Sequence, residues 1–281
     1  MYPTQPGFRV IRVKARRIFT PTRIPGASWV INQYVGCGHA CTYCYAKFVS
    51  RLKRYGEWGG WVEVKVNAPE LVRGVHVKGR VYMSSVSDPY QPVERRLLLT
   101  RRVLKSMDKR IELSILTKSD LVLRDLDMLR LFKNLEVGLT INGFTGSVKS
   151  VLEPFSPAHE RRVEALRALK EAGIANFCFI SPVIPGLVDV EQLVVETRGF
   201  VDKYWVEMIN LRASGRRFRD WLSETLPESY KVAGNSGRLR AYALKIASRL
   251  KELNVKVEGV ILNPGVKPIK ISSSLQGYGL S

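Results

Sequence analysis

The chain of 281 residues lacks the features that mark secreted and membrane proteins. No apolar stretch approaches the ~20 residues that a membrane helix needs. Its first residues, MYPTQPGFRVIRVKARR, carry basic side chains but no apolar core of a secretory signal. Cysteine is also scarce: four residues do not make a dense disulfide framework. We therefore expect a soluble, cytoplasmic protein with no membrane partner.

Acidic side chains are few as well. The chain has 25 Asp and Glu against 45 Lys and Arg, a net charge of +20. Such an excess favours partners that carry phosphate, because neutralising phosphates releases their bound counterions. A solvated surface rich in Lys and Arg, as in many heat-stable proteins, is the alternative. Nucleic acid is thus a partner hypothesis that charge alone leaves open.

What the chain does have is an alternation of strand-like and helix-like segments. Apolar runs of strand length occur at 29–35, 81–86, 111–117, 135–141, 174–180, 204–209 and 255–261. Helical patterns lie between most of them, at 43–54, 100–107, 121–132, 157–172, 190–197 and 238–253. This alternation predicts βαβ units and a parallel sheet, and hence an α/β protein.

Polar residues collect where the predicted strands end. They are Ser84, Ser85, Ser87, Asp88, Thr117, Lys118, Thr140, Asn142, Ser181, Glu207 and Asn210. Polar groups at one rim suit the mouth of a (β/α) barrel, although the strand ends of a Rossmann-like sheet also carry function. Six or seven units favour an open, partial (β/α)6-type TIM barrel of parallel strands. We assign it to 29–263, between a basic amino-terminal arm (1–28) and a carboxyl-terminal tail (264–281).

Three of the four cysteines, Cys37, Cys41 and Cys44, stand close together in GCGHACTYC, after the first predicted strand. In an intracellular chain such spacing indicates metal or redox chemistry. Iron–sulfur clusters normally take four cysteine thiolates, so three would leave one iron of a cubane open. Zinc held by these cysteines and His39 is the alternative. Structural zinc usually takes two ligand pairs with a longer spacer, which favours the cluster.

The cysteine loop, with an aromatic Tyr43 before the last cysteine, resembles the signature of the radical S-adenosylmethionine (SAM) enzymes. The wider chain is similar to the branch around spore photoproduct lyase and DNA repair photolyase-like proteins. The likeness lies in SSVSDPYQPVE (84–94), ILTKSDLVLRDLDML (115–129), EPFSPAHERRVEALRALKEAGI (153–174) and SPVIPGL (181–187).

This resemblance implies one 4Fe–4S cluster per chain on Cys37, Cys41 and Cys44, with SAM bound at the open iron. An external one-electron reductant would drive cleavage of SAM to a 5′-deoxyadenosyl radical, which takes a hydrogen atom from the substrate. It implies that the SAM-binding residues are Tyr43, Ser85, Ser87, Asp88, Lys118, Thr140, Asn142 and Ser181. Charge and likeness together favour a nucleic acid or nucleotide substrate, in repair or modification.

Two alternatives for the function stay open from the sequence. The substrate could instead be a protein side chain or a small metabolite, and a non-catalytic, zinc-stabilised nucleic-acid-binding protein is the alternative from another class. Cys178 lies within an apolar strand, where alternation sets it opposite Phe177 and Phe179, so we interpret it as a small buried hydrophobe rather than a hydrogen-atom donor. We expect Arg161 and Arg162 to lie on the outer face of a helix, in solvent.

Overall fold

The computed structural model describes residues 5–262 and 268–270. Most of the tail assigned to 264–281 therefore lies outside the described residues. Within them, no helix combines the length and the apolar character needed to cross a membrane.

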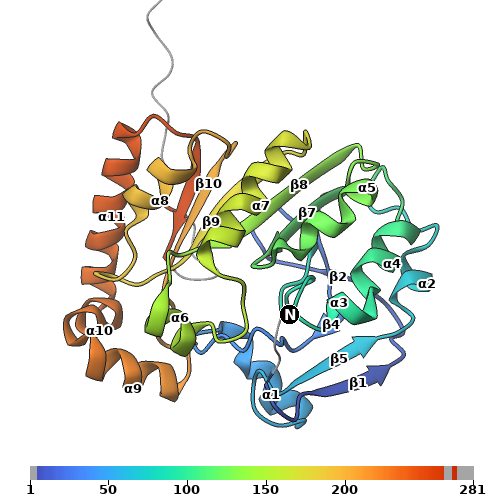
Figure 1. Ribbon diagram of the computed structural model, residues 1–281, viewed down its shortest axis with the longest axis horizontal. Helices are drawn as coiled ribbons and strands as arrows, with labels where there is room; N and C mark the ends of the chain where they lie inside the picture. Colours follow the sequence, from blue (N-terminus) through green and yellow to red (C-terminus); the bar gives the residue numbers. More distant parts are fainter. Residues whose placement is uncertain (1–4, 263–267, 271–281) are drawn as a thin grey trace, which may run out of the picture.

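Seven parallel strands and one antiparallel edge strand form the main sheet of the described chain (Figure 1). These strands, in spatial order, are β11 (Val257–Ile261), β10 (Tyr204–Met208), β9 (Asn176–Val183), β8 (Asn134–Ile141), β7 (Glu112–Thr117), β6 (Val81–Met83), β3 (Trp29–Ile31) and β2 (Phe19–Pro21). Neighbours from β3 to β11 run parallel, and β2 closes the β3 edge as the antiparallel strand. The prediction of an open α/β barrel of parallel strands is confirmed, and each predicted strand segment overlaps one of the seven.

Helices lie between the strands along the chain. They are α1 (Phe48–Lys53), α2 (Ala68–Val72), α3 (Glu94–Leu97), α4 (Leu99–Ser106), α5 (Leu126–Leu129), α6 (Gly146–Leu152), α7 (His159–Glu171), α8 (Val190–Thr197), α9 (Arg216–Thr225), α10 (Pro227–Gly234) and α11 (Ser236–Glu252), with 3-10 turns η1 (Tyr45–Lys47) and η2 (Asp120–Asp125). In Figure 1, α4, α5, α7, α8 and α11 cross the sheet in the same order as the strands they follow. The long apolar strands, buried beneath these helices, form the core.

A second, small sheet was not predicted from the sequence. It joins β1 (Arg9–Val13), β5 (Trp61–Lys65) and β4 (Tyr34–Val35). Val35, Val49 and Trp61 form a separate apolar core between this sheet and α1. Burying a side chain of this kind contributes about 1.5–3 kcal/mol, so this core fixes α1 in place. The segment 1–28 thus supplies β1 to the small sheet and β2 to the large one.

The other face of the main sheet is the inside of the partial barrel. In parallel strands, residues at the same register share a face, so Tyr82, Ser114 and Glu136 lie side by side there. Further along, Gly138 pairs with Phe177. A Cβ on Gly138 would stand 2.2 Å from the Phe177 ring, so only glycine fits.

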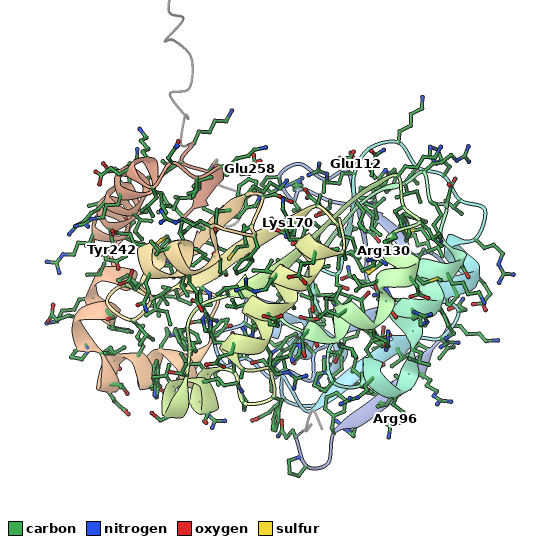
Figure 2. All side chains as sticks on the ribbon, turned by 45° about the horizontal axis from the view of Figure 1, so that its top comes forward. Arg96, Glu112, Arg130, Lys170, Tyr242 and Glu258 are labelled. Atoms are coloured by element: carbon green, nitrogen blue, oxygen red, sulfur yellow. The ribbon has the colours of Figure 1, made fainter. Side chains whose placement is uncertain are left out.

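The two ends of the strands differ in what they carry. Glu112 and Glu258, near the amino ends of β7 and β11, lie along one edge of the molecule in Figure 2. The cysteine loop, α1, α6 and α9 lie at the carboxyl ends of the strands, along the lower edge of Figure 1. This second edge holds the polar residues singled out above.

Candidate functional site

The cysteine loop begins with a turn that only glycine can make. Gly36 has φ of +87°, and a Cβ there would lie 2.7 Å from the Trp61 carbonyl oxygen. Past it, the amide of Ala40 donates to the carbonyl of Cys37 at 3.3 Å, and that of Cys44 to Cys41 at 3.3 Å. These tight turns bring the three cysteines onto one short loop without any regular element between them.

Gln91 and Ser87 hold the start of this loop. The Gln91 side chain accepts from the Gly38 amide at 2.8 Å and donates to the Gly36 carbonyl at 3.2 Å. Ser87 Oγ also donates to the Gly36 carbonyl, at 2.6 Å, and accepts from Gln91 at 2.8 Å. The sequence reasoning missed Gln91, whose only signal was its place three residues after Asp88.

Asp88 ties the loop to the end of β7. Its carboxylate accepts from Thr117 Oγ1 at 2.6 Å and from the Lys118 amide at 2.8 Å, and it lies 3.4 Å from His39 Nε2. Burial would raise the pKa of Asp88, but His39 and these donors lower it below its ordinary value. The other ring nitrogen of His39 faces the Phe155 carbonyl at 3.2 Å. Both ring nitrogens thus face protein oxygens rather than the cysteines.

A fully buried glutamate, Glu153, lies behind the middle of the loop. Its carboxylate accepts from the Tyr43 hydroxyl, from Asn142 Nδ2 at 2.7 Å and from Ser156 Oγ at 2.9 Å, and it forms an ion pair with Arg162. Two predicted SAM-binding residues, Tyr43 and Asn142, are thereby joined through one carboxylate. Sequence reasoning did not single out Glu153, since an acid followed by proline is typical of an ordinary turn.

Arg162 is buried, and the prediction from the sequence that it lies in solvent is therefore wrong. It is 2% exposed, and its guanidinium also donates to the carbonyls of Thr140, at 3.2 Å, and Pro157, at 2.8 Å. The face of α7 that looked solvated packs on the strand end because Glu153 supplies the opposite charge. Burial would raise the pKa of Glu153, yet Arg162 and Lys118 hold it well below its usual range.

The remaining predicted residues line the same rim. Lys118 Nζ lies 3.8 Å from Glu153 and 5.8 Å from the centre of the Tyr43 ring. Ser85 is held by Asn32, whose side-chain oxygen accepts from the Ser85 amide at 2.8 Å. Ser181 Oγ donates to Glu207 Oε2 at 2.8 Å.

Glu207 is a rim residue to which the sequence reasoning gave no role. It lies near the end of β10, and burial raises its pKa above the ordinary value, although Ser181 and Lys118 act in the opposite direction. The charge of Glu207 contributes to raising the pKa values of Cys44 and Tyr45, although burial is the main cause of both shifts.

The donor set of the loop fits a cluster with three protein ligands. Cys37 and Cys41 are buried and Cys44 is partly exposed. Burial raises the pKa of all three thiols, that of Cys41 to about 12. Thiols bound to iron are deprotonated, so loading such a site releases protons and the metal charge offsets the burial of thiolates. Among the described residues, no three His, Cys, Asp or Glu side chains gather around a point that one metal ion would fill.

Cys178 does not belong to this loop. It is fully buried in β9 and packs within the main apolar core, while its neighbour Phe177 covers Gly138 on the inside of the barrel. Burial raises the pKa of its thiol, which suits a small apolar residue. The alternation inferred from the sequence, which set Cys178 opposite Phe177, agrees with this placement.

Comparison with known proteins identifies the family. The model of the radical SAM superfamily matches residues 31–198, which contain the three cysteines and most of the rim residues. The chain belongs to the radical SAM superfamily. Membership implies a 4Fe–4S cluster and SAM as cofactors, and the three-thiol loop is the place in this chain that fits them.

Relatives and solved structures extend this finding. An uncharacterized protein of Methanocaldococcus jannaschii is 49% identical over 254 residues, which cover 90% of this chain and 98% of that protein. An uncharacterized protein of Acidianus two-tailed virus is 30% identical over 227 residues, 73% of each chain.

The fold resembles that of spore photoproduct lyase. Its complex with dinucleoside spore photoproduct has a TM-score of 0.53 and 19% identity, and the match covers 70% of this chain and 61% of the lyase. A variant of that lyase with bound AdoMet and dinucleoside spore photoproduct has a TM-score of 0.55 and 19% identity, covering 78% and 66%. This chain therefore spans less than two thirds of the lyase, and the likeness is one of fold.

Proposed function

We propose that this protein holds one 4Fe–4S cluster on Cys37, Cys41 and Cys44 and cleaves SAM reductively. The observation that carries the proposal is the three-thiol loop at the carboxyl edge of the barrel, whereas the fourth cysteine, Cys178, is buried within β9. When bound, the cluster would supply the electron that breaks a C–S bond of SAM, and the 5′-deoxyadenosyl radical so formed would take a hydrogen atom from the substrate.

The residues of this chain would bind and orient SAM from the rim. Lys118 offers a cation for the carboxylate of its methionine part, and Asn142, Thr140 and Ser181 offer polar groups at neighbouring strand ends. Tyr43, packed edge-to-face against Phe144 at 6.3 Å between ring centres, would form an apolar wall that excludes water.

Within the same proposal, we revise the roles that the sequence predicted for Ser85, Ser87 and Asp88. Ser87 and Asp88 use their hydrogen bonds on the cysteine loop and on β7, and Ser85 on Asn32. We propose that Ser87 and Asp88 mainly hold the loop in shape, and that Ser85, which is only partly buried, keeps the role of a SAM contact predicted from the sequence.

For the substrate we propose a nucleic acid or nucleotide. The net charge of +20 favours a phosphate-bearing partner, and a solved structure of similar fold holds a dinucleoside spore photoproduct. The reaction we propose is repair or modification of that substrate. An external one-electron reductant and a cytoplasmic location complete the proposal.

The first test is anaerobic reconstitution with iron and sulfide, followed by reduction with dithionite in the presence of SAM. We expect about four irons and four sulfides per chain and formation of 5′-deoxyadenosine. Cys41→Ala should lower 5′-deoxyadenosine formation by more than about 100-fold, because even the outer partners of metal ligands are worth roughly 10- to 100-fold.

Cys178→Ala is the matched control, since it removes a thiol that packs in the core. It should keep the full iron and sulfide content and the rate of SAM cleavage. Bound zinc without sulfide, or equal effects of the two substitutions, would contradict the proposal.

A further inference from the structure

A strip of exposed apolar side chains follows the last cysteine of the loop. Tyr45 and Phe48 are 44% and 50% exposed, and Leu52 is 73% exposed. They lie three and four positions apart along η1 and α1, so they share one face of these helical turns. Val49, which neighbours these residues on the same helical turns, is instead buried in the small core. The fold thus leaves parts of two aromatic rings and a leucine accessible beside the cluster loop.

The start of α9 lies next to the helical turns that carry this strip. Lys47 Nζ is 3.3 Å from the Ser214 carbonyl oxygen, just before α9 begins. Arg216 and Arg217 open α9, and both side chains are exposed. Figure 1 draws α1 and α9 along the same lower edge of the molecule. A second basic element therefore borders the aromatic strip.

The arginines around the strip form no ion pair with an acidic side chain of the described residues. Arg51, Arg54, Arg216 and Arg217 are exposed, and none makes a salt bridge to a carboxylate anywhere in the described part of the chain. By contrast, the exposed Arg249 on α11 pairs with a glutamate at 3.2 Å. Positive charge thus stays available on both sides of the exposed rings.

We infer that this α1–α9 surface binds an unpaired stretch of a nucleic acid strand. The surface consists of Tyr45, Phe48, Arg51, Leu52, Arg54, Arg216 and Arg217. Proteins that bind single strands combine cations for the phosphates with aromatic rings on which bases stack. An acidic protein would match the charge alone, and a paired duplex keeps its bases stacked away from such rings.

The position of the surface connects it to the proposed reaction, on whose nucleic acid substrate this inference rests. Tyr45 directly follows Cys44, and its hydroxyl donates to the Ser85 carbonyl at the rim of the barrel. A strand bound along α1 would therefore pass beside the cluster loop, and one of its nucleotides would be presented at the barrel mouth.

Binding of a fluorescent single strand of about 12 nucleotides, measured by anisotropy against salt, tests the surface. The full chain would be used, with DNA and RNA probes and polyglutamate as an acidic polypeptide. Arg51→Gln with Arg217→Gln should weaken strand binding about tenfold at 0.1 M salt and reduce the salt slope by about 1.4, since each phosphate contact contributes about 0.7.

The matched control removes two positive charges at the amino edge of the sheet, by Lys133→Gln with Arg198→Gln, and should leave both the affinity and the slope nearly unchanged. Phe48→Ala should weaken binding roughly 10- to 100-fold at every salt concentration while the slope stays the same, because stacking releases no counterions. SAM cleavage without substrate should not change in any of these variants.

The outcomes separate this inference from the proposed function. If the wild-type chain binds strands and the α1–α9 variants bind them equally well, the surface is wrong while the substrate class survives. If the wild-type chain binds no strand at low salt, both fail. Binding of polyglutamate that the same variants weaken, with strand binding unaffected, would assign the surface to an acidic protein and overturn the inference.

Discussion

Two glutamates lie on the inside of the barrel, Glu136 near the amino ends of the strands and Glu207 near the carboxyl ends. Their pKa values are shifted in opposite directions. Glu136 accepts from Lys203 Nζ at 2.5 Å and from Arg80 at 3.1 Å, and these cations hold its pKa below the ordinary value although burial would raise it. For Glu207 burial dominates, and its pKa is raised.

This contrast separates an amino edge that mainly supports stability from a carboxyl edge that can interact with a ligand. At the amino edge, Lys203 and Arg80 neutralise the Glu136 carboxylate, so its burial there costs little electrostatic free energy. The carboxyl edge leaves Glu207 and Lys118 only partly compensated, so both can still interact with a bound ligand. In barrel enzymes the carboxyl edge carries the active site and the amino edge mainly stability.

The buried pair behind the cysteine loop should show the largest effect. Arg162→Met leaves the Glu153 carboxylate buried without its main cation, which should lower the free energy of unfolding by about 3–5 kcal/mol. Urea unfolding of the apoprotein measures it. Adding Glu153→Gln to the same chain should recover part of the loss, because the unpaired charge is then gone. A loss below about 1 kcal/mol would mean that Lys118 alone satisfies Glu153.

At the amino edge the expected effect is smaller and confined to stability. Glu136→Gln should cost about 1–2 kcal/mol at pH 7, since the pair is partly exposed, and leave SAM cleavage unchanged. The folded-state pKa of Glu136 is lowered, so its contribution is present above the unfolded pKa, about 4.3, and is lost as the pH falls through the folded value. The cost should therefore shrink in unfolding experiments below pH 4.

The smallest effect should have the opposite sign, at the carboxyl edge. The pKa of Glu207 is raised in the folded state, so its charged form costs stability as the pH rises above about 4.3. Glu207→Gln should therefore stabilise the apoprotein at pH 7 by up to about 1 kcal/mol, with less gain near pH 4. Destabilisation at pH 7 would remove the contrast between the two edges.

Much of the fold could be predicted from the sequence because its strands are long apolar runs. All seven parallel strands overlap predicted segments, and most of the predicted helices are present with shifted ends. The strands β1 and β5 were missed for a physical reason. Arg9 and Arg12 make β1 look like solvated chain. β5 is buried by contacts that form only in the fold, since Trp61 packs on Val35 and Val49 while Val62 and Val64 join the main core.

The site could be predicted only for residue patterns that serve few purposes in proteins. Three thiols at close spacing in an intracellular chain mostly bind metal or carry out redox chemistry, and polar residues after strands must gather at one edge. Glu153 and Arg162 do not belong to such a pattern in the sequence. A glutamate before a proline and an arginine on a helix are ordinary surface residues until the fold buries them against each other.

By itself the sequence determined the class of fold and the loop that fits the cluster, because periodicity and cysteine spacing are local properties of the chain. Tertiary structure alone decided which charges are neutralised: Arg162 is paired and buried, whereas Arg51 and Arg217 are left without acidic partners, among the described residues, beside exposed rings. The reason is that burial and pairing depend on residues brought together from distant parts of the chain. A charge therefore shows its role only when its surroundings are known.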